Sequence, residues 1–492
     1  MMKRNIILIL IIGGIYLKAQ GQSANKSLKP PNILFIMVDD LRPELGCYDQ
    51  PHIKSPNIDR LARMGQLFTQ AYVNYPVCGP SRAILLSGLY GSTNRFNGWN
   101  CSQDKDVPGL VSLPMHFKNN NYSTVSLGKV YNNFEDGKGS WDDIWRPALT
   151  TTAWDYQSEE GISIFKSLNE DRQYNTKPRN NQNLPNRGPA FENPEIEDVA
   201  YEDGRIATKA MEKLQKFKST GEAFFMAVGF KKPHLPFNAP KRYWDLYDRE
   251  AIELPANFYP PKNAPKESLH NYSELRAYSN IPNEGPFSEE LSKALIHGYY
   301  ASVSYVDSQV GRVLDELENL GLDENTIVVL WGDHGWQLGE HELWCKHSNF
   351  NTSTRIPLIF KIPGKISDVK QQSLVETVDI YPTLCELAGI NTPIHAQGKS
   401  FAAILDDPMA EGKKAIFSRS NLGGETVITK THAYTEFYDK DGQLKSNMLF
   451  DLVNDPDENE NTVDKPKNKA VVAEMTELLR NHMVNRNSIS LP

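Results

Sequence analysis

Unbroken runs of apolar, β-branched and aromatic residues recur along the chain, with helical patterns between them. Five runs stand out: NILFIMV at 32–38, YSTVSLG at 122–128, AFFMAVGF at 223–230, TIVVLWG at 326–332 and IPLIFKI at 356–362. Continuous rather than alternating hydrophobicity predicts strands that are covered on both faces. The sequence therefore predicts an α/β fold with a large central, mostly parallel sheet flanked by helices.

The segments between the runs show apolar residues at helical spacing. They predict helices over 55–65, with Ser55 as a possible N-cap, over 204–217 and over 297–321. A further helical pattern, SRAILLSGL, follows Pro80, a residue that suits a first helical turn. Cys78 is therefore expected just before a helix N-terminus, where free N–H groups and the helix dipole favour anions.

The pattern changes after about residue 398. HAYTEFY, the turn signal DKDG and SNMLFDL predict an antiparallel hairpin, and 471–483 predicts a closing helix. We therefore expect a main domain over 22–398 and a smaller C-terminal α+β subdomain over 399–492. Two stretches rich in proline and polar residues, about 170–197 and 254–286, are predicted to be long surface insertions, which often carry binding loops.

The N-terminus has the features of an export signal. Lys3 and Arg4 precede an uncharged apolar run over 6–17, and small residues follow it. This order predicts a cleaved signal peptide over 1–21 and a periplasmic or secreted protein. A membrane anchor is the alternative, but the run is shorter than the roughly 20 residues of a spanning helix, so we expect no stable membrane insertion after cleavage.

Composition excludes some functions and leaves the state of the cysteines open. The formal net charge is -8, and it becomes more negative without the basic signal peptide, so no nucleic-acid footprint is visible. Five cysteines in an exported chain leave at least one unpaired. The remaining four either form up to two disulfides or stay as thiols: Cys47, Cys101, Cys345 and Cys385.

Acidic residues follow two of the predicted strands. Asp39 and Asp40 come directly after the first run, and Asp333 and His334 come after the fourth. Each aspartate alone is ordinarily an N-cap or turn residue. Ligands of open α/β sheets bind at the carboxyl ends of the strands, however, and three aspartates gathered there would repel one another without a cation. Oxygen ligands suit Ca²⁺ or Mg²⁺ better than zinc.

Basic side chains occur at corresponding places: Arg82 one turn into the helix after Cys78, Lys129 after the second run, Lys232 and His234 after the third, and Lys346 at the end of GWQLGEHELWCK. A hard cation ringed by such groups predicts an anionic substrate group with more than one oxygen. A thiolate at Cys78 could be a nucleophile of low pKa. Beside an ion that prefers oxygen, however, sulfur would be a mismatched ligand.

The stretch CGPSR at 78–82, completed by LSG, resembles the C-x-P-S-R motif of the type I sulfatases of the alkaline phosphatase superfamily. Within that family the likeness is to the iduronate-2-sulfatase branch. It is carried by PNILFIMVDDLRPELGCYD, SPNIDRLA, VCGPSR, LGKVY, AVGFKKPHLPF, GDHGWQLGEHELWCKHSNF and RIPLIFKIPG, which together extend from Pro31 to about Asp457.

The resemblance implies a sulfuric ester hydrolase in which a separate maturation enzyme oxidises Cys78 to formylglycine before export. It implies one Ca²⁺ ion with five ligands: Asp39, Asp40, Asp333, His334 and the modified Cys78. It further implies that four residues hold or protonate the sulfate ester of a sulfated carbohydrate: Arg82, Lys129, His234 and Lys346. In the mechanism that the resemblance implies, one hydroxyl of the aldehyde hydrate attacks sulfur and displaces the sugar alcohol, which gives a covalent sulfated enzyme. Loss of the proton of the second hydroxyl then expels sulfate and regenerates the aldehyde. His234 is the expected general acid.

The sequence departs from the branch at Asn132, where a histidine usually stands three residues after the lysine. Asparagine can hydrogen-bond the hydrate but cannot exchange a proton with it. A structural role for His234 between Pro233 and Pro236 is the alternative to catalysis. Two other functions also stay open, namely a phosphodiesterase or phosphonate hydrolase of the same superfamily and a non-catalytic glycan-binding relative. As substrates we expect ulvan, carrageenan or a glycosaminoglycan, with a 2-sulfate beside a uronic acid favoured by the resemblance.

Overall fold

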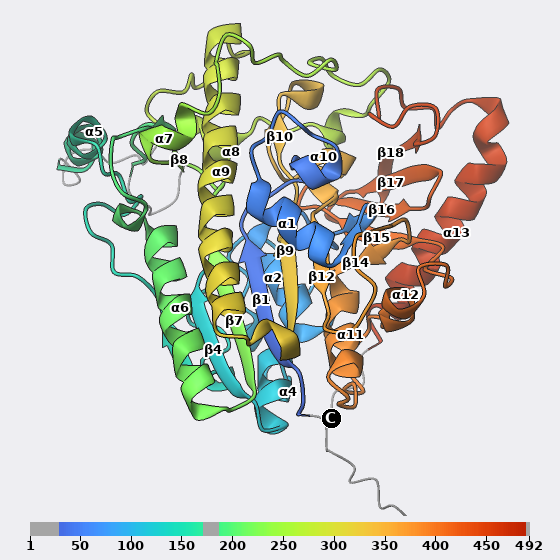
Figure 1. Cartoon of the computed structure of the whole chain (residues 1–492). Helices are drawn as coiled ribbons and strands as arrows, with labels where there is room; N and C mark the ends of the chain where they lie inside the picture. Colours follow the sequence, from blue (N-terminus) through green and yellow to red (C-terminus); the bar gives the residue numbers. More distant parts are fainter. Residues whose placement is uncertain (1–28, 171–185, 489–492) are drawn as a thin grey trace, which may run out of the picture.

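A central eight-stranded sheet organises the computed structural model, which describes residues 29–170 and 186–488 (Figure 1). The strand order is β13-β2-β12-β9-β1-β7-β4-β5. Its strands are β1 (Asn32–Val38), β2 (Gln66–Phe68), β4 (Ser123–Gly128), β5 (Asp143–Trp145), β7 (Phe224–Phe230), β9 (Thr326–Gly332), β12 (Leu358–Lys361) and β13 (Val369–Gln371). All five predicted strands are present. The predicted signal peptide and residues 171–185 of the first insertion lie outside the described residues.

The sheet is mostly parallel, as predicted. β9, β1, β7, β4 and β5 all run in the same direction. The exception is β12, which is antiparallel to both of its neighbours, β9 and β2, while β13 is parallel to β2. Every residue of β1, β7 and β9 is buried, which agrees with their continuous hydrophobicity.

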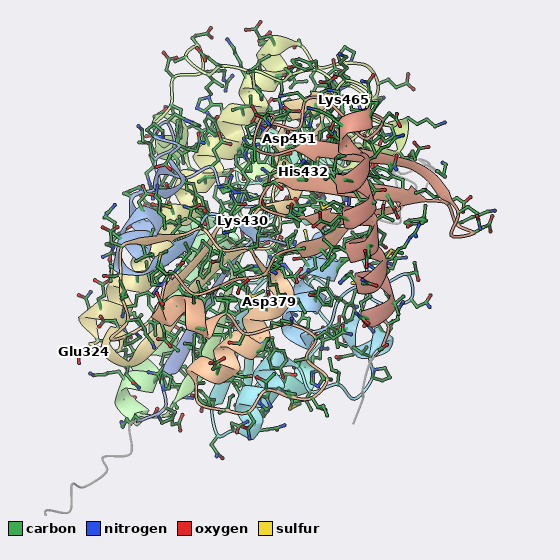
Figure 2. All side chains as sticks on the ribbon, turned by 90° about the vertical axis from the view of Figure 1, so that its right-hand side faces the viewer. Glu324, Asp379, Lys430, His432, Asp451 and Lys465 are labelled. Atoms are coloured by element: carbon green, nitrogen blue, oxygen red, sulfur yellow. The ribbon has the colours of Figure 1, made fainter. Side chains whose placement is uncertain are left out.

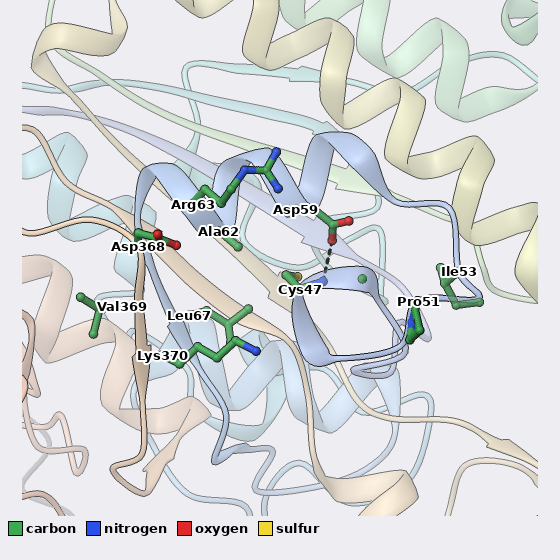
Figure 3. Close-up of a pocket in the computed structure, with 11 residues that line it drawn as sticks. Cys47, Pro51, Ile53, Asp59, Ala62, Arg63, Leu67, Asp368, Val369 and Lys370 are labelled. Atoms are coloured by element: carbon green, nitrogen blue, oxygen red, sulfur yellow. Dashed lines mark hydrogen bonds between the residues drawn. The ribbon is translucent and has the colours of Figure 1, made fainter.

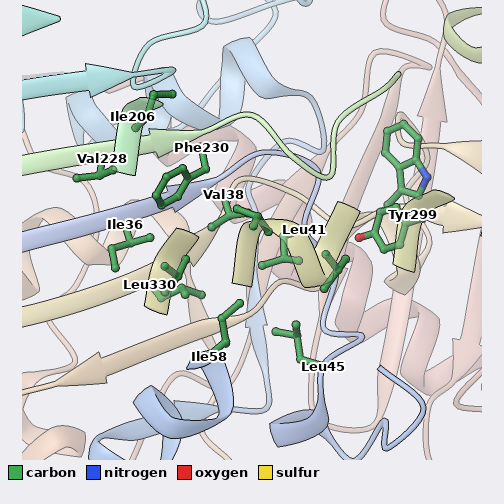
Figure 4. Packing of buried hydrophobic residues seen from close by; sticks show 14 of the residues in the cluster. Ile36, Val38, Leu41, Leu45, Ile58, Ile206, Val228, Phe230, Tyr299 and Leu330 are labelled. Carbon is green, nitrogen blue, oxygen red and sulfur yellow. The ribbon is translucent and has the colours of Figure 1, made fainter. Parts of the chain in front are cut away.

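Helices cover both faces of the sheet, so β1 contributes to two hydrophobic cores. Leu34 and Ile36 belong to the core built with α1 (Pro56–Met64), α6 (Glu202–Thr220) and α9 (Glu289–Asn319). Figure 4 shows part of this core. Ile33 and Phe35 alternate with them and belong to the core built with α2 (Cys78–Ser87), α4 (Leu113–Asn119) and α11 (Ile380–Leu387). This two-sided burial fixes the register of the strand that leads to Asp39.

The helix α1 lies where it was predicted, but its N-terminus is capped differently. The side chain of Ser55 makes no capping hydrogen bond. Instead, the backbone amides of Asn57 and Ile58 donate to the carboxylate of Asp307, a buried residue of α9, at 3.1 and 2.8 Å. The cap therefore comes from a residue 250 positions away in the chain, which the local pattern could not reveal.

A four-stranded antiparallel sheet forms the C-terminal region. It consists of β15 (Ile416–Arg419), β16 (Gly424–Ile428), β17 (His432–Tyr438) and β18 (Leu444–Asp451), and α13 (Lys469–Asn485) packs on it. The predicted hairpin is β17–β18, and its end pairs His432 with Asp451, which lie close together in Figure 2. The predicted closing helix is α13. The boundary at residue 398 stays a prediction.

Short elements complete the fold. The helices are α3 (Gln103–Asp106), α5 (Glu159–Glu170), α7 (Lys241–Trp244), α8 (Ser273–Arg276), α10 (Asn351–Thr354) and α12 (Ala402–Asp406), and the strands are β3 (Ala71–Tyr72), β6 (Phe191–Glu192), β8 (Phe237–Asn238), β10 (Gln337–Leu338), β11 (Trp344–Cys345) and β14 (Val375–Glu376). No helix among residues 29–170 and 186–488 is long and apolar enough to cross a membrane.

The five cysteines all lie within the described residues, and none of them is in a disulfide. Cys47 lines a pocket near the start of α1 (Figure 3). Its amide donates to Asp59 at 2.7 Å. Burial and the carboxylate of Asp59 raise the pKa of the Cys47 thiol. The structure therefore favours free thiols over the disulfides that the count of cysteines left open.

Two facing glycines allow β4 and β7 to approach closely at their carboxyl ends. Gly128 pairs with Gly229, and the amide of Lys129 donates to the carbonyl of Gly229 at 2.9 Å. A Cβ atom on Gly229 would collide with the carbonyl oxygen of Lys129. The absence of a side chain at this position therefore sets where Lys129 enters the rim of the sheet.

We predict that Gly229→Ala lowers the free energy of unfolding by about 1–3 kcal/mol, the usual cost of overpacking, and also lowers turnover, because Lys129 must move. Chemical denaturation and initial rates measure the two effects. The matched control is Gly139→Ala, whose Cβ would meet its nearest neighbour, Met115, at an ordinary 3.7 Å. Equal stability and turnover of the Gly229 variant and the parent protein would contradict this role.

Candidate active site

The parallel strands bring the predicted site residues to one edge of the sheet. Val38 lies beside both Phe230 and Gly332 in the register, so β1, β7 and β9 end together. The ladder continues one step further, since Asp39 donates its amide to Phe230 and Asp333 donates its amide to Val38, both at 3.2 Å. Asp39–Asp40 and Asp333–His334 therefore follow adjacent strands at the same level of the sheet.

Arg82 and Lys129 bind two of the carboxylates. The Arg82 guanidinium, which is fully buried, donates to Asp333 at 2.9 Å and to Asp39 at 3.1 Å. Lys129 Nζ lies 2.5 Å from the other oxygen of Asp39. Although burial favours the neutral acid, Lys129 and Arg82 hold the pKa of Asp39 well below its usual range.

Asp40 connects the remaining groups. Its backbone has a positive φ of 59°, and its amide donates to Asp333 at 2.9 Å. Its carboxylate lies 3.1 Å from Lys346 Nζ and 3.1 Å from His334 Nε2. Asp40 itself follows β1, and its partners come from the segment after β9 and from the end of the β10–β11 hairpin, so Asp40 joins three separate parts of the chain.

Cys78 is the first residue of α2 and faces this cluster. Its Sγ lies 3.1 Å from His334 Nε2 and 3.7 Å from Asp40 Oδ1. Cys78 was predicted to lie just before the helix and is instead its first residue, so the prediction differs from the structure by one residue. Burial, together with the charge of Asp39, raises the pKa of the Cys78 thiol well above its usual range. The environment of the unmodified sulfur thus disfavours the thiolate nucleophile of low pKa that the sequence left open.

The donor set fits a hard divalent ion. Ligand atoms of Asp39, Asp40, Cys78 and His334 all lie within 4.8 Å of one another, and all four residues are buried. Asp333 adjoins them, with an oxygen 3.6 Å from His334 Nε2. His334 Nδ1 contacts the carbonyl of Gly335 at 2.9 Å, and Nε2 faces the cluster, so Nε2 is the nitrogen that would bind an ion. Carboxylate oxygens suit Ca²⁺, while the His334 nitrogen is less typical of a calcium site and the cysteine sulfur is a mismatched ligand.

A tight turn after β7 presents His234. The amides of Lys231 and Lys232 donate to the buried carboxylate of Asp203 on α6, each at 2.8 Å. Lys232 Nζ in turn donates to the His234 carbonyl at 3.0 Å. Lys232 therefore supports the turn from inside and is not among the residues that face the cluster.

The ring of His234 is oriented by contacts at both nitrogens. Nδ1 lies 2.6 Å from the carbonyl of Leu235, which can only accept a hydrogen bond. Nε2 lies 3.2 Å from Glu274 and 4.0 Å from Asp40, and carboxylates also accept. This arrangement places a proton on Nε2, toward the cluster, which is the position a general acid requires.

Glu274 is a member of the site that the sequence analysis missed. It lies on α8 within the predicted insertion 254–286. Its carboxylate is 2.9 Å from Lys346 Nζ and 3.5 Å from His347 Nε2, in addition to its contact with His234. No motif marks this glutamate. The only signal was the prediction that the insertion carries a binding loop.

Asn132, at the position where the branch usually has histidine, contacts a neighbouring loop. Its side-chain amide donates to the carbonyl of Trp99 at 2.8 Å. That same carbonyl packs directly against Gly79, the residue after Cys78. Asn132 therefore supports the loop that covers the first turn of α2.

The chain is similar to known proteins in both fold and sequence. The chain superposes on the solved structure of a 2-O GAG sulfatase with a TM-score of 0.70 at 22% identity, covering 94% of this chain and 95% of that one. It is 33% identical over 418 residues to iduronate 2-sulfatase of Mus musculus, covering 78% of this chain and 72% of the relative. It is 28% identical over 454 residues to an ulvan-active sulfatase of Formosa agariphila, covering 89% and 78%.

The fold is thus that of the sulfatases. A family model described as Sulfatase matches residues 31–390, and one described as N-sulphoglucosamine sulphohydrolase, C-terminal, matches residues 339–485. This chain belongs to the sulfatase family, and it is a sulfuric ester hydrolase. The resemblance that the motifs predicted is confirmed.

Substitution of Asp203 tests whether this residue holds the turn that presents His234. We predict that Asp203→Ala lowers both the melting temperature and turnover, because two backbone amides lose their acceptor, at about 1–3 kcal/mol for each buried group left unpaired. Asp203→Asn keeps one acceptor oxygen and is expected to lose less. Unchanged turnover in the alanine variant would show that His234 does not depend on this contact.

Proposed function

We propose that this sulfatase removes sulfate from a sulfated glycan, with formylglycine formed from Cys78 as the nucleophile and one Ca²⁺ ion in the acidic cluster. The observation that carries the proposal is the position of Cys78. Its sulfur faces His334 and Asp40 at 3.1 and 3.7 Å, in a group whose other members suit an oxygen-seeking ion. If oxygen replaced that sulfur, the side chain at position 78 would also suit such an ion.

We assign the ion five ligands: Asp39, Asp40, Asp333, His334 and the modified side chain at position 78. When bound, the ion would polarise the hydroxyl groups that the hydrated aldehyde supplies for attack on sulfur. Arg82 and Lys129 hold Asp39 and Asp333 in place from the opposite side. Lys129 and Lys346 are the cations available to the sulfuryl oxygens, and their fixed positions suit stabilisation of developing negative charge.

His234 is our candidate general acid. The leaving sugar oxygen needs a proton, and Nε2 is the ring nitrogen that faces Asp40 and Glu274. Asn132 cannot accept a proton and is engaged with Trp99. We therefore do not assign it the acid or base role that a histidine could fill at this position.

The substrate proposal rests on the relatives and on the N-terminal sequence. Similarity to an iduronate 2-sulfatase and to an ulvan-active sulfatase favours a sulfated polysaccharide or oligosaccharide, either algal, such as ulvan or carrageenan, or a glycosaminoglycan. A 2-sulfated uronic acid is the form suggested by the first of these relatives. The predicted signal peptide favours a periplasmic or secreted enzyme, which agrees with a polymeric substrate.

Conversion of Cys78 is the first test. We predict that the protein produced with a formylglycine-generating enzyme lacks the sulfur at position 78 by peptide mass spectrometry and releases sulfate from sulfated oligosaccharides. Cys78→Ala should release none, because no side-chain oxygen remains to attack. Cys47→Ser is the control and should keep its activity. Turnover of aryl phosphate but not aryl sulfate esters by the converted protein would contradict the proposal.

Removal of the ion is the second test. We predict that a chelator lowers the melting temperature and that Ca²⁺ restores it, since an ion at about 100 times its Kd stabilises the folded state by about 2.7 kcal/mol. Mg²⁺ should restore less, because it demands a smaller octahedral site. Asp40→Asn should abolish the response to Ca²⁺. A melting temperature that is indifferent to chelator and to Ca²⁺ would contradict the metal assignment.

A further inference from the structure

Glu274 places a fourth carboxylate in a site that must bind an anion. Three basic side chains reach the cluster, namely Arg82, Lys129 and Lys346, and four carboxylates accompany them, namely Asp39, Asp40, Asp333 and Glu274. The three aspartates follow strands of the central sheet. Glu274 comes instead from the insertion, so the core of the fold does not require it.

The position of Glu274 is on the solvent side of the cluster. Its side chain is 15% exposed and that of His234 is 12% exposed, whereas Asp39 and Asp40 are fully buried. Glu274 and His234 are therefore accessible from solvent, as is Lys129 with 17% exposure, whereas the two aspartates are not. Glu274 is therefore close enough to influence the charge of whatever binds.

The partners of Glu274 are groups that we assign to the sulfate ester. Its two oxygens lie 2.9 and 3.1 Å from Lys346 Nζ, and one of them lies 3.2 Å from His234 Nε2. Burial opposes ionisation, but Lys346, His234 and His347 hold the pKa of Glu274 well below its usual range, so the carboxylate stays charged. It competes with an incoming anion for Lys346 and for His234.

We propose that Glu274 is a specificity-determining residue, which sets the site to accept a singly charged sulfate ester and to disfavour doubly charged oxyanions. This inference rests on the proposed function of the site. The energy between two charges scales with their product, so a fixed negative charge penalises a dianion about twice as much as a monoanion of the same shape. A sulfate monoester is a monoanion, while inorganic sulfate and phosphate monoesters near neutral pH are dianions.

Two consequences follow from this charge difference. Glu274 weakens the binding of phosphate monoesters more than that of sulfate esters of the same alcohol, which shifts the selectivity of the site between two tetrahedral groups of similar size toward sulfate. The product, inorganic sulfate, carries one more negative charge than the substrate that produced it. Glu274 therefore also favours release of the product.

The test is the variant Glu274→Gln, which keeps the size of the side chain and removes its charge. Calorimetry gives the Kd for methyl sulfate, a monoanion, and for inorganic sulfate, a dianion with the same tetrahedral head. We expect methyl sulfate to bind about fivefold tighter to the variant and inorganic sulfate about 25-fold tighter, the square of the first factor. Glu274→Ala is a second neutral variant with the same expected order.

Two controls isolate the charge at position 274. Glu267→Gln changes a glutamate of the same insertion that binds Lys445 and Ser446 instead, and it should alter neither Kd. Glu274→Asp keeps the charge and should keep the ratio of the two dissociation constants within about twofold of the parent ratio. Melting temperatures verify that each variant is folded.

Equal tightening for both anions would overturn the proposal, and so would weaker binding of both, which would mean that Glu274 only holds Lys346 and His234 in place. Calorimetry needs no turnover. If the parent protein releases no sulfate from any ester, the proposed function fails, while the comparison of the two anions still decides the role of Glu274.

Discussion

Parallel pairing of β9, β1, β7 and β4 is the constraint on which the site depends. Because these strands run in one direction, the residues that follow them lie at a single edge of the sheet. The ends of β1, β7 and β9 are aligned in the register, so the residues after these three strands lie at the same height along the strands. Burial on both faces prevents any strand from slipping by one residue without moving its apolar side chains to the wrong core. The positions of Asp39, Asp333 and Lys129 are thus consequences of hydrophobic packing.

Charges that are buried at this edge need partners, and the fold supplies them from outside the sheet. Arg82 enters from α2 and binds two of the aspartates, Lys129 binds one of these two as well, and Lys346 follows the β10–β11 hairpin and binds the third. A buried ion pair contributes little net stability, because both charges lose their hydration. The ion pairs instead hold each cation at a fixed position, where an anionic group can bind to it.

The sequence predicted the sheet and most of the site because both depend on local signals. Continuous apolar runs located the five strands, and the residue after each strand could be assigned to the rim. Glu274 could not be predicted in this way, since its partners are 40 and 72 positions away from it in the chain. The same reason explains the cap of α1, which comes from Asp307 and not from the adjacent Ser55.

The central claim is that the sheet edge forms one binding site for a divalent ion with an oxygen-bearing side chain at position 78. Anomalous X-ray diffraction from crystals of the converted protein grown with Ca²⁺ tests it most directly. The account predicts one anomalous peak within bonding distance of Asp39, Asp40, Asp333 and residue 78, with density for oxygen and not sulfur at that residue. The absence of a peak among these aspartates, or an intact cysteine in a protein that releases sulfate, would contradict it.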